Sequence, residues 1–280
     1  MGERLSVSII AKNAEGSLER CLRSVTWADE LVVLDGQSTD RTREIARSAG
    51  AKVLEKKFES FPIERHHALQ QTSHHWVLSL DADMIVPPAL AREIQELLRR
   101  GPDCDAYLLR CLNHFMGREI RHCAWFDHRF LRLFDKRKGH YDLTAKVLDQ
   151  FICAGRVGRL THHLVHHQTE TLEEYLQKMT RLFAPLTADE YMQKGVRIRW
   201  WNLPWYFLLR PGVVFVYKYV WKRGFLDGVP GLIICLNSAV LYYFIFSTMW
   251  DRQQGVPDYQ LQRYLPHDPD PRRSPDARCL

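Results

Sequence analysis

Short apolar runs alternate with helix-like stretches through the first hundred residues, and this alternation constrains the fold more than any other feature. Four runs are rich in branched apolar side chains, which is typical of buried strands. They are residues 5–10, 31–34, 52–54 and 76–80. Strands that alternate with helices predict crossover units and a mostly parallel sheet. In such sheets ligands bind beyond the carboxyl ends of the strands.

Helix boundaries between and after these strands are marked by capping residues. Ser17 is expected to cap the first helix, and Pro88 begins a helix that Gly101 ends. A capping box at residues 171–174 predicts a longer helix that runs to about Gly195. Residues 104–170, by contrast, consist of short β-type pieces separated by turns. The sequence therefore predicts an α/β domain followed by a helical region.

Composition excludes several other classes of protein. Of the 280 residues, 46% are hydrophobic and 26% charged, which is ordinary for a globular protein and unlike a disordered or fibrous chain. The seven cysteines form no C-x-x-C pair. A disulfide framework and a zinc ribbon are both disfavoured, and a reducing cytosolic compartment is expected.

Polar side chains follow three of the four strands at the point where each strand ends. They are Asn13, Glu15, Asp35, Asp40, Asp81 and Asp83. Asp40 is expected to cap the helix that follows it. The spacing of Asp81 and Asp83 after an apolar strand is different, because two such carboxylates can hold Mg²⁺ or Mn²⁺ together with a diphosphate. The cation would then neutralise the charge of a departing nucleotide diphosphate.

In combination, these motifs resemble the family 2 glycosyltransferases, which have a Rossmann-like nucleotide-sugar-binding fold of the A type. The resemblance is carried by residues 7–15, 31–42 and 79–83. Further segments resemble the lipopolysaccharide-core glucosyltransferase branch of the family. These segments are residues 125–127, 132–134, 155–160, His166 and residues 224–228. Altogether the resemblance covers about residues 5–250.

The resemblance implies a set of donor-binding residues. Asn13, Glu15 and Asp35 would line the nucleotide pocket, and Asp35 would accept a hydrogen bond from the uracil ring, as a carboxylate can. Asp81 would lie beside the ribose and the metal, and Asp83 would coordinate the cation. The implied cofactor is thus a divalent metal, Mg²⁺ or Mn²⁺, and the implied donor is a UDP-sugar.

The resemblance also implies a catalytic base and acceptor contacts. The branch usually carries Val-His-Glu with the glutamate as base, and this chain has Val-Leu-Asp, in which Asp149 keeps a carboxylate and Leu148 replaces the imidazole. Asp127 is the second candidate base. His166 and Arg132 are expected to contact the acceptor. One base and one metal, without a protein nucleophile, suit a single displacement with inversion.

A basic and aromatic segment at residues 191–226 precedes an almost wholly apolar stretch at residues 232–249. Its tryptophans are Trp200, Trp201, Trp205 and Trp221. Tryptophan favours the membrane interface and basic side chains meet anionic head groups, so a helical hairpin that lies in or dips into one leaflet is predicted. A solvated helix pair remains an alternative. A nucleic-acid patch is disfavoured, because no nucleic-acid-binding fold surrounds it.

These observations predict three regions and one function. Residues 1–170 would form the A-type catalytic domain, residues 171–250 a helical membrane-associating region, and residues 251–280 a disordered tail. The expected activity is transfer of a hexose, glucose from UDP-glucose, to a lipid-linked saccharide such as lipopolysaccharide core. The expected location is the cytoplasmic face of the inner (plasma) membrane. A polyprenyl-phosphate acceptor and a catalytically silent membrane-docking scaffold are the alternatives.

Overall fold

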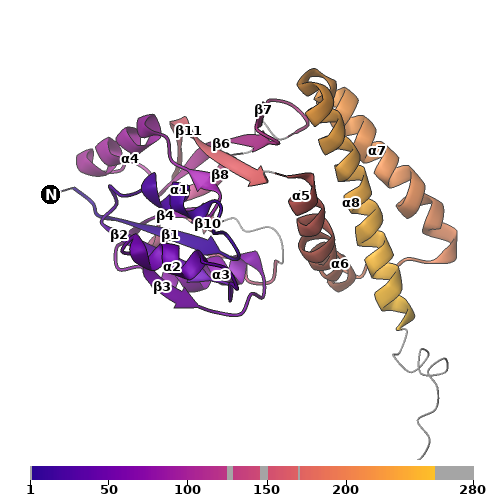
Figure 1. Cartoon of the computed structure of the whole chain (residues 1–280), viewed down its shortest axis with the longest axis horizontal. Coiled ribbons are helices and arrows are strands. Elements are labelled where there is room, and N and C mark those ends of the chain that lie inside the picture. The colour runs from indigo at the N-terminus through magenta and orange to yellow at the C-terminus, as the bar shows by residue number, and fades with distance from the viewer. Residues whose placement is uncertain (1, 125–128, 146–150, 170, 256–280) are drawn as a thin grey trace, which may run out of the picture.

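The computed structural model describes residues 2–124, 129–145, 151–169 and 171–255. Figure 1 shows two parts of the molecule. The sheet and the helices that cover it lie at the left of the view, and a group of C-terminal helices lies at the right. The sheet has nine strands, eight of them in the order β3-β2-β1-β4-β8-β6-β11-β5, with β7 paired to β6. A separate two-stranded sheet joins β9 (Gly139–Tyr141) and β10 (Phe151–Cys153).

The first half of the sheet is parallel, as the sequence predicts. Its strands are β1 (Leu5–Ala11), β2 (Glu30–Asp35), β3 (Lys52–Glu55) and β4 (Trp76–Asp81). The connecting helices are α1 (Leu18–Arg23), α2 (Thr42–Ser48) and α3 (Phe61–Gln70). Ala11 pairs with Asp35 and Ile10 pairs with Asp81, so the carboxyl ends of β2 and β4 flank the end of β1.

The second half of the sheet is mixed. It contains β5 (Met84–Ile85), β6 (Ala106–Phe115), β7 (Arg118–Ile120), β8 (Arg129–Asp135) and β11 (Val157–Thr169). β8 is antiparallel to both β4 and β6, whereas β11 runs parallel to β6 and antiparallel to β5. Pairing of β5 with β11 brings His166 opposite Met84, next to the end of β4. This pairing positions a histidine beside Asp83.

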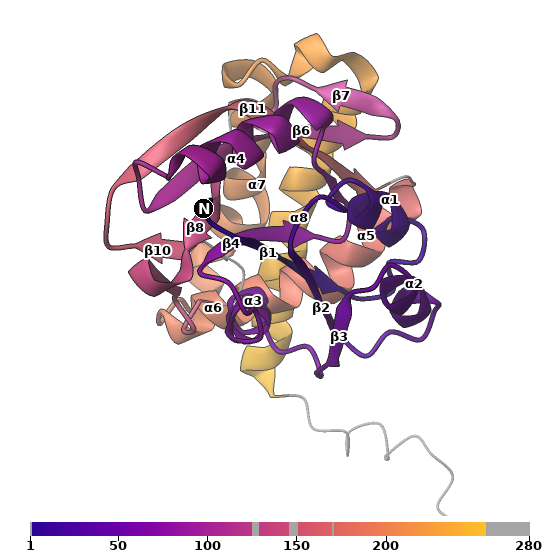
Figure 2. The ribbon, with the colours of Figure 1, turned by 90° about the vertical axis from the view of Figure 1, so that its left-hand side faces the viewer.

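Helices cover both faces of the sheet, because alternate residues of its buried strands point to opposite sides. On β4, Leu78 and Leu80 join the core shared with α1 and with α4 (Pro88–Arg100), whereas Val77 packs toward Leu69 of α3. Figure 2 shows α4 and α3 on opposite sides of the sheet. The mixed sheet covered by helices confirms the fold class expected from the sequence.

The C-terminal region is helical. α5 (Leu172–Lys178) continues through a π-helical turn at Met179–Phe183 into α6 (Ala184–Gln193). Thr171 caps α5 through a hydrogen bond from the Glu174 amide, as predicted. A further helix then runs through two π-helical turns, Trp205–Leu209 and Tyr217–Trp221, on either side of α7 (Arg210–Val216). Short 3-10 turns lie at Lys136–Lys138, Trp200–Asn202 and Gly224–Asp227.

The chain then returns along α7 as α8 (Gly228–Gln254), and the two helices form the predicted hairpin (Figure 1). Among the described residues, one helical stretch, Gly224–Gln254, qualifies by length and composition as able to cross a membrane. The mean hydropathy of an 18-residue window within it is 1.9, and 33% of that window is buried. α8 extends four residues past the boundary expected at residue 250.

Two local features differ from the sequence-based expectations. Ser17 occupies the position before α1, but its hydroxyl contacts the Ala14 carbonyl and makes no cap hydrogen bond to the helix. The helix α3 was not predicted. It carries no continuous apolar stripe, and it buries Glu64 and Arg65 beside the apolar Ala68 and Leu69.

Candidate active site

Asp81 is the last residue of β4, and two arginines hold its carboxylate. Arg65 of α3 forms an ion pair with one carboxylate oxygen, and Arg132 Nη2 of β8 lies 3.4 Å from the other. Arg65 also donates to the hydroxyl of Ser79, two residues earlier on β4, at 3.0 Å. Burial raises the pKa of Asp81, but the two guanidinium groups outweigh burial and hold the pKa below its ordinary value.

Asp83 lies two residues beyond β4 and faces two other cationic side chains. His166 Nε2 of β11 is 3.1 Å from Oδ1, and Lys178 Nζ of α5 is 3.8 Å from Oδ2. Burial favours a neutral Asp83, yet His166 and Lys178 together keep its pKa below the ordinary value. The other ring nitrogen of His166, Nδ1, lies 3.1 Å from Asn113 Oδ1, which fixes the orientation of the imidazole.

Asp81, Asp83 and His166 form a cluster with the chemistry of a metal site. One donor atom from each residue can be chosen so that all three lie within 4.8 Å of one another. Two carboxylates and one imidazole suit Mn²⁺, and the carboxylates also suit Mg²⁺. The donor set therefore fits the divalent cation that the sequence predicts. It also includes His166, which was expected to contact the acceptor.

Asp35 lies at the same edge of the sheet, two strands away from Asp81. The residue is completely buried, and its Oδ2 accepts a hydrogen bond from the Ser38 amide at 2.8 Å. Arg43 Nε lies 3.9 Å from the same oxygen. Among the described residues, Oδ1 of Asp35 has no hydrogen-bond partner. Buried polar atoms are almost always paired, so this oxygen is available to a ligand donor.

Asn13 and Glu15 connect the loops that follow β1 and β2. Asn13 Oδ1 accepts from the Thr39 amide at 2.9 Å, and Glu15 Oε2 accepts from the Arg41 amide at 3.1 Å. Asp40 Oδ1 accepts from the amide of Thr42, the first residue of α2, at 3.0 Å, but Arg41 and not Asp40 occupies the cap position of that helix. These contacts hold the two loops together beside Asp35.

The structure brings some of the expected site residues together and leaves others untested. Asp81, Asp83, His166 and Arg132 converge, whereas the candidate bases Asp127 and Asp149 lie outside the described residues. Two cationic residues of the site, Arg65 and Lys178, were missed by sequence reasoning. The pattern around Arg65 gave no signal, and Lys178, in the last turn of α5, belongs to no motif.

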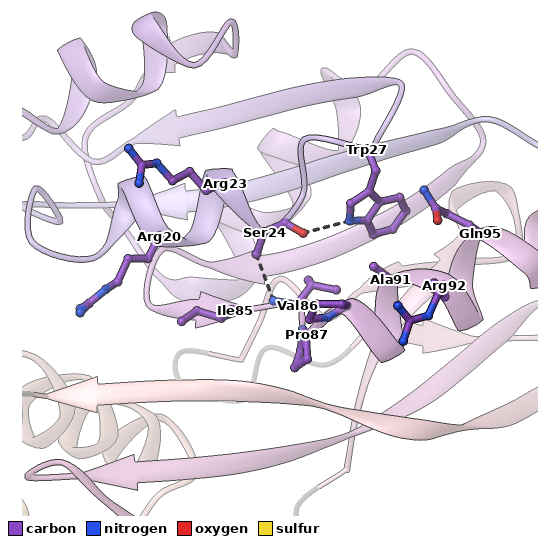
Figure 3. A pocket seen from close by; sticks show the side chains of 11 residues that line it. Arg20, Arg23, Ser24, Trp27, Ile85, Val86, Pro87, Ala91, Arg92 and Gln95 are labelled. Atoms are coloured by element: carbon purple, nitrogen blue, oxygen red, sulfur yellow. Dashed lines mark hydrogen bonds between the residues drawn. The ribbon is translucent and has the colours of Figure 1, made fainter.

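A groove of the described residues is lined by side chains outside this cluster. It has a volume of about 620 Å³ and separates α1 from the start of α4 (Figure 3). Trp27 Nε1 donates to the Ser24 carbonyl at 2.9 Å, and the Ser24 hydroxyl accepts from the Val86 amide at 3.0 Å. The side chains that line the groove include none of the clustered carboxylates.

Comparisons with curated proteins give relatives that match nearly the whole chain. The lipopolysaccharide core biosynthesis glycosyltransferase LpsC of Rhizobium meliloti is 27% identical over 254 residues, which cover 89% of this chain and 92% of the relative. An uncharacterized glycosyltransferase of Rickettsia typhi is 25% identical and covers 81% of this chain and 82% of its own.

Among solved structures, residues 1–349 of S. aureus TarS align with a TM-score of 0.46 at 12% identity, over 90% of this chain and 92% of that one. The model of glycosyl transferase family 2 matches residues 6–164, which include Asp35, Asp81 and Asp83. That match spans more than half of the chain. It includes the motifs that end in Asp35, Asp81 and Asp83 at the carboxyl edge of the sheet. The chain belongs to glycosyl transferase family 2.

Proposed function

We propose that this glycosyltransferase moves a hexose, glucose from UDP-glucose, to a lipid-linked saccharide such as lipopolysaccharide core, with inversion and with a divalent cation. The observation that carries the proposal is the convergence of Asp81, Asp83 and His166 at the carboxyl edge of the sheet. The name of the relative LpsC supports the acceptor class.

The nucleotide end of the donor would bind at β1 and β2. Asp35 presents a buried carboxylate oxygen that has no partner in the described part of the chain, and such an oxygen can accept from the N–H of a uracil ring. Asn13 and Glu15 would line this pocket, because their contacts order the two loops next to Asp35. The diphosphate end of such a donor would point toward the carboxylate cluster, because β1 lies between Asp35 of β2 and Asp81 of β4.

At the cluster, Asp81, Asp83 and His166 would hold the cation. When bound, the cation neutralises charge on the departing diphosphate. Arg65 and Arg132 keep Asp81 ionised and fix its orientation. We assign His166 to the cation on this geometry, and the acceptor contacts expected of His166 and Arg132 stay predictions.

The acceptor side needs a base for the attacking hydroxyl. Asp149 is the first candidate to take this proton, and Asp127 is the second. The hydroxyl oxygen bonds to the anomeric carbon as the nucleotide diphosphate leaves from the opposite face, which gives inversion.

A donor screen tests the proposal. UDP-glucose, UDP-galactose, UDP-N-acetylglucosamine and GDP-mannose are each added to the full chain with and without Mn²⁺, and thermal unfolding is followed. UDP-glucose with Mn²⁺ is expected to give the largest rise, because a ligand at 100 times its Kd adds about 2.7 kcal/mol to apparent stability. The absence of any response to UDP-sugars would support the silent scaffold instead.

A lipid-linked acceptor requires the enzyme to reach a membrane, and the helical hairpin would provide the contact. Its helices expose large apolar side chains over most of their length. The most exposed are Trp221 at 78%, Leu208 at 71% and Val229 at 69%, and Trp200, in the 3-10 turn just before the hairpin, is 75% exposed. Tryptophans next to basic residues are typical of a membrane interface. We therefore infer docking of this surface at the inner face of the plasma membrane.

Vesicle binding of the full chain tests this contact. Replacement of Trp221 with serine is expected to weaken partition into anionic vesicles by at least about 10-fold, because burial of a large apolar side chain contributes roughly 1.5–3 kcal/mol. Leu143→Ser, a change at a half-exposed leucine of the sheet domain, is the control and should leave partition unchanged. Equal binding by Trp221→Ser and wild type would contradict the proposed orientation.

A further inference from the structure

Lys178 is the most exposed of the cationic groups around the two carboxylates. Its side chain is 47% exposed, compared with 1% for Arg65, 5% for Arg132 and 15% for His166. Its ammonium nevertheless lies 3.8 Å from Asp83 Oδ2, inside the cluster that fits a divalent cation. A mobile positive charge therefore stands beside one of the expected metal ligands.

The backbone of Lys178 is fixed, although its side chain has room to move. One turn earlier, Tyr175 packs edge-on against Phe115 of β6, with 5.3 Å between ring centroids. The next residue, Met179, is almost completely buried, and Phe183 stacks on Phe61 at the start of α3. α5 is thus held against the sheet domain, so any rearrangement of Lys178 is confined to its flexible four-carbon chain.

Charge around the cluster requires such a rearrangement when a cation binds. Two carboxylates already face the guanidinium groups of Arg65 and Arg132, the imidazole of His166 and the ammonium of Lys178. A divalent cation adds two positive charges at short range, where repulsion between like charges is strong. His166 can be a ligand only as the neutral imidazole, so it gives up its proton when the cation binds. The two arginines are buried, so Lys178 is the remaining charge that can move away at least cost.

We propose that Lys178 is a mobile counter-ion that neutralises Asp83 in the donor-free enzyme and turns to the diphosphate of the donor when the cation binds. This inference rests on the proposed function, because the second position of Lys178 requires a nucleotide diphosphate. Its consequence is thermodynamic. Lys178 opposes binding of the cation alone and favours binding of the cation and the nucleotide together, so the two ligands bind with positive coupling.

The inference is tested with Mn²⁺ and UDP on the full chain, without any measurement of transfer. Free Mn²⁺ is quantified by electron paramagnetic resonance, with and without saturating UDP, for wild type, Lys178→Met and Lys178→Arg. Lys178→Met is expected to bind Mn²⁺ alone at least about 5-fold more tightly and to lose at least about 5-fold of the coupling to UDP, at the lower end of typical coupling factors. Lys178→Arg, which keeps the charge, should retain the coupling.

Lys194→Met is the matched control, because Lys194 pairs with Glu190 of α6 and not with the cluster. It should leave both Mn²⁺ affinity and coupling at the wild-type values. Unchanged or weaker Mn²⁺ binding by Lys178→Met overturns the counter-ion role, whether or not UDP binds. A wild type that binds Mn²⁺ but no UDP overturns the proposed function and with it the second position of Lys178.

Discussion

Asp83→Asn is expected to lower the rate of UDP-glucose turnover by more than about 100-fold. In metal sites, loss of a residue that only hydrogen-bonds to a metal ligand already lowers metal affinity or activity by about 10–100-fold, and loss of a ligand should cost more. Asp83 would be a direct ligand of the cation, and asparagine removes its charge while it keeps the shape and one acceptor oxygen. Turnover is measured as release of UDP in the presence of saturating Mn²⁺.

Two comparisons make this result specific. Asp251→Asn removes a carboxylate from the exposed end of α8 and should leave turnover at the wild-type rate. Melting curves of Asp83→Asn should show that the chain is still folded, since the carboxamide can accept from the same neighbours. Turnover within threefold of wild type would remove Asp83 from the site.

Arg65→Met is expected to destabilise the folded chain by about 3 kcal/mol, because removal of one partner from a buried ion pair leaves the other charge uncompensated. The Arg65 side chain is 1% exposed, and it connects α3 to both Ser79 and Asp81 of β4. Methionine fills similar volume but supplies no charge to Asp81. The expected drop in melting temperature is roughly 6–10 °C for a chain of this size.

The control for this change is Arg99→Met on the surface of α4. Arg99 pairs with Glu96 in solvent, and such exposed pairs contribute about 0–1 kcal/mol. Intrinsic tryptophan fluorescence follows unfolding of both variants in the same buffer. If the two variants melt within 1 °C of each other, Arg65 does not balance the charge of Asp81 as the structure indicates.

The parallel half of the fold and its carboxylates were predictable from local pattern. Residues 31–34 form one apolar run because β2 is buried on both faces, and Asp81 and Asp83 follow a strand of the same kind. Parallel pairing alone brings the ends of such strands to one edge. The presence of Asp35 and Asp81 at one edge therefore followed from the alternation of strands and helices. Their places on either side of β1 came from the structure.

The partners of these carboxylates were not predictable in the same way. His166 reaches Asp83 only because β11 pairs with β5 across more than eighty residues of chain, and no local pattern encodes that pairing. Arg65 lies in a helix without an apolar stripe. The Arg65 side chain is buried where it forms an ion pair with Asp81. Tertiary contacts, and not local propensity, determine these parts of the site.

The central claim is that Asp81, Asp83 and His166 together hold a cation at the donor site. Pulsed electron paramagnetic resonance of the chain with Mn²⁺ and UDP tests it directly, because a coordinated imidazole gives a nitrogen coupling to the bound ion. We expect this coupling in wild type and in His167→Gln, and its loss in His166→Gln. A complex of Mn²⁺ and UDP that shows no nitrogen coupling, or one unchanged in His166→Gln, would contradict the claim.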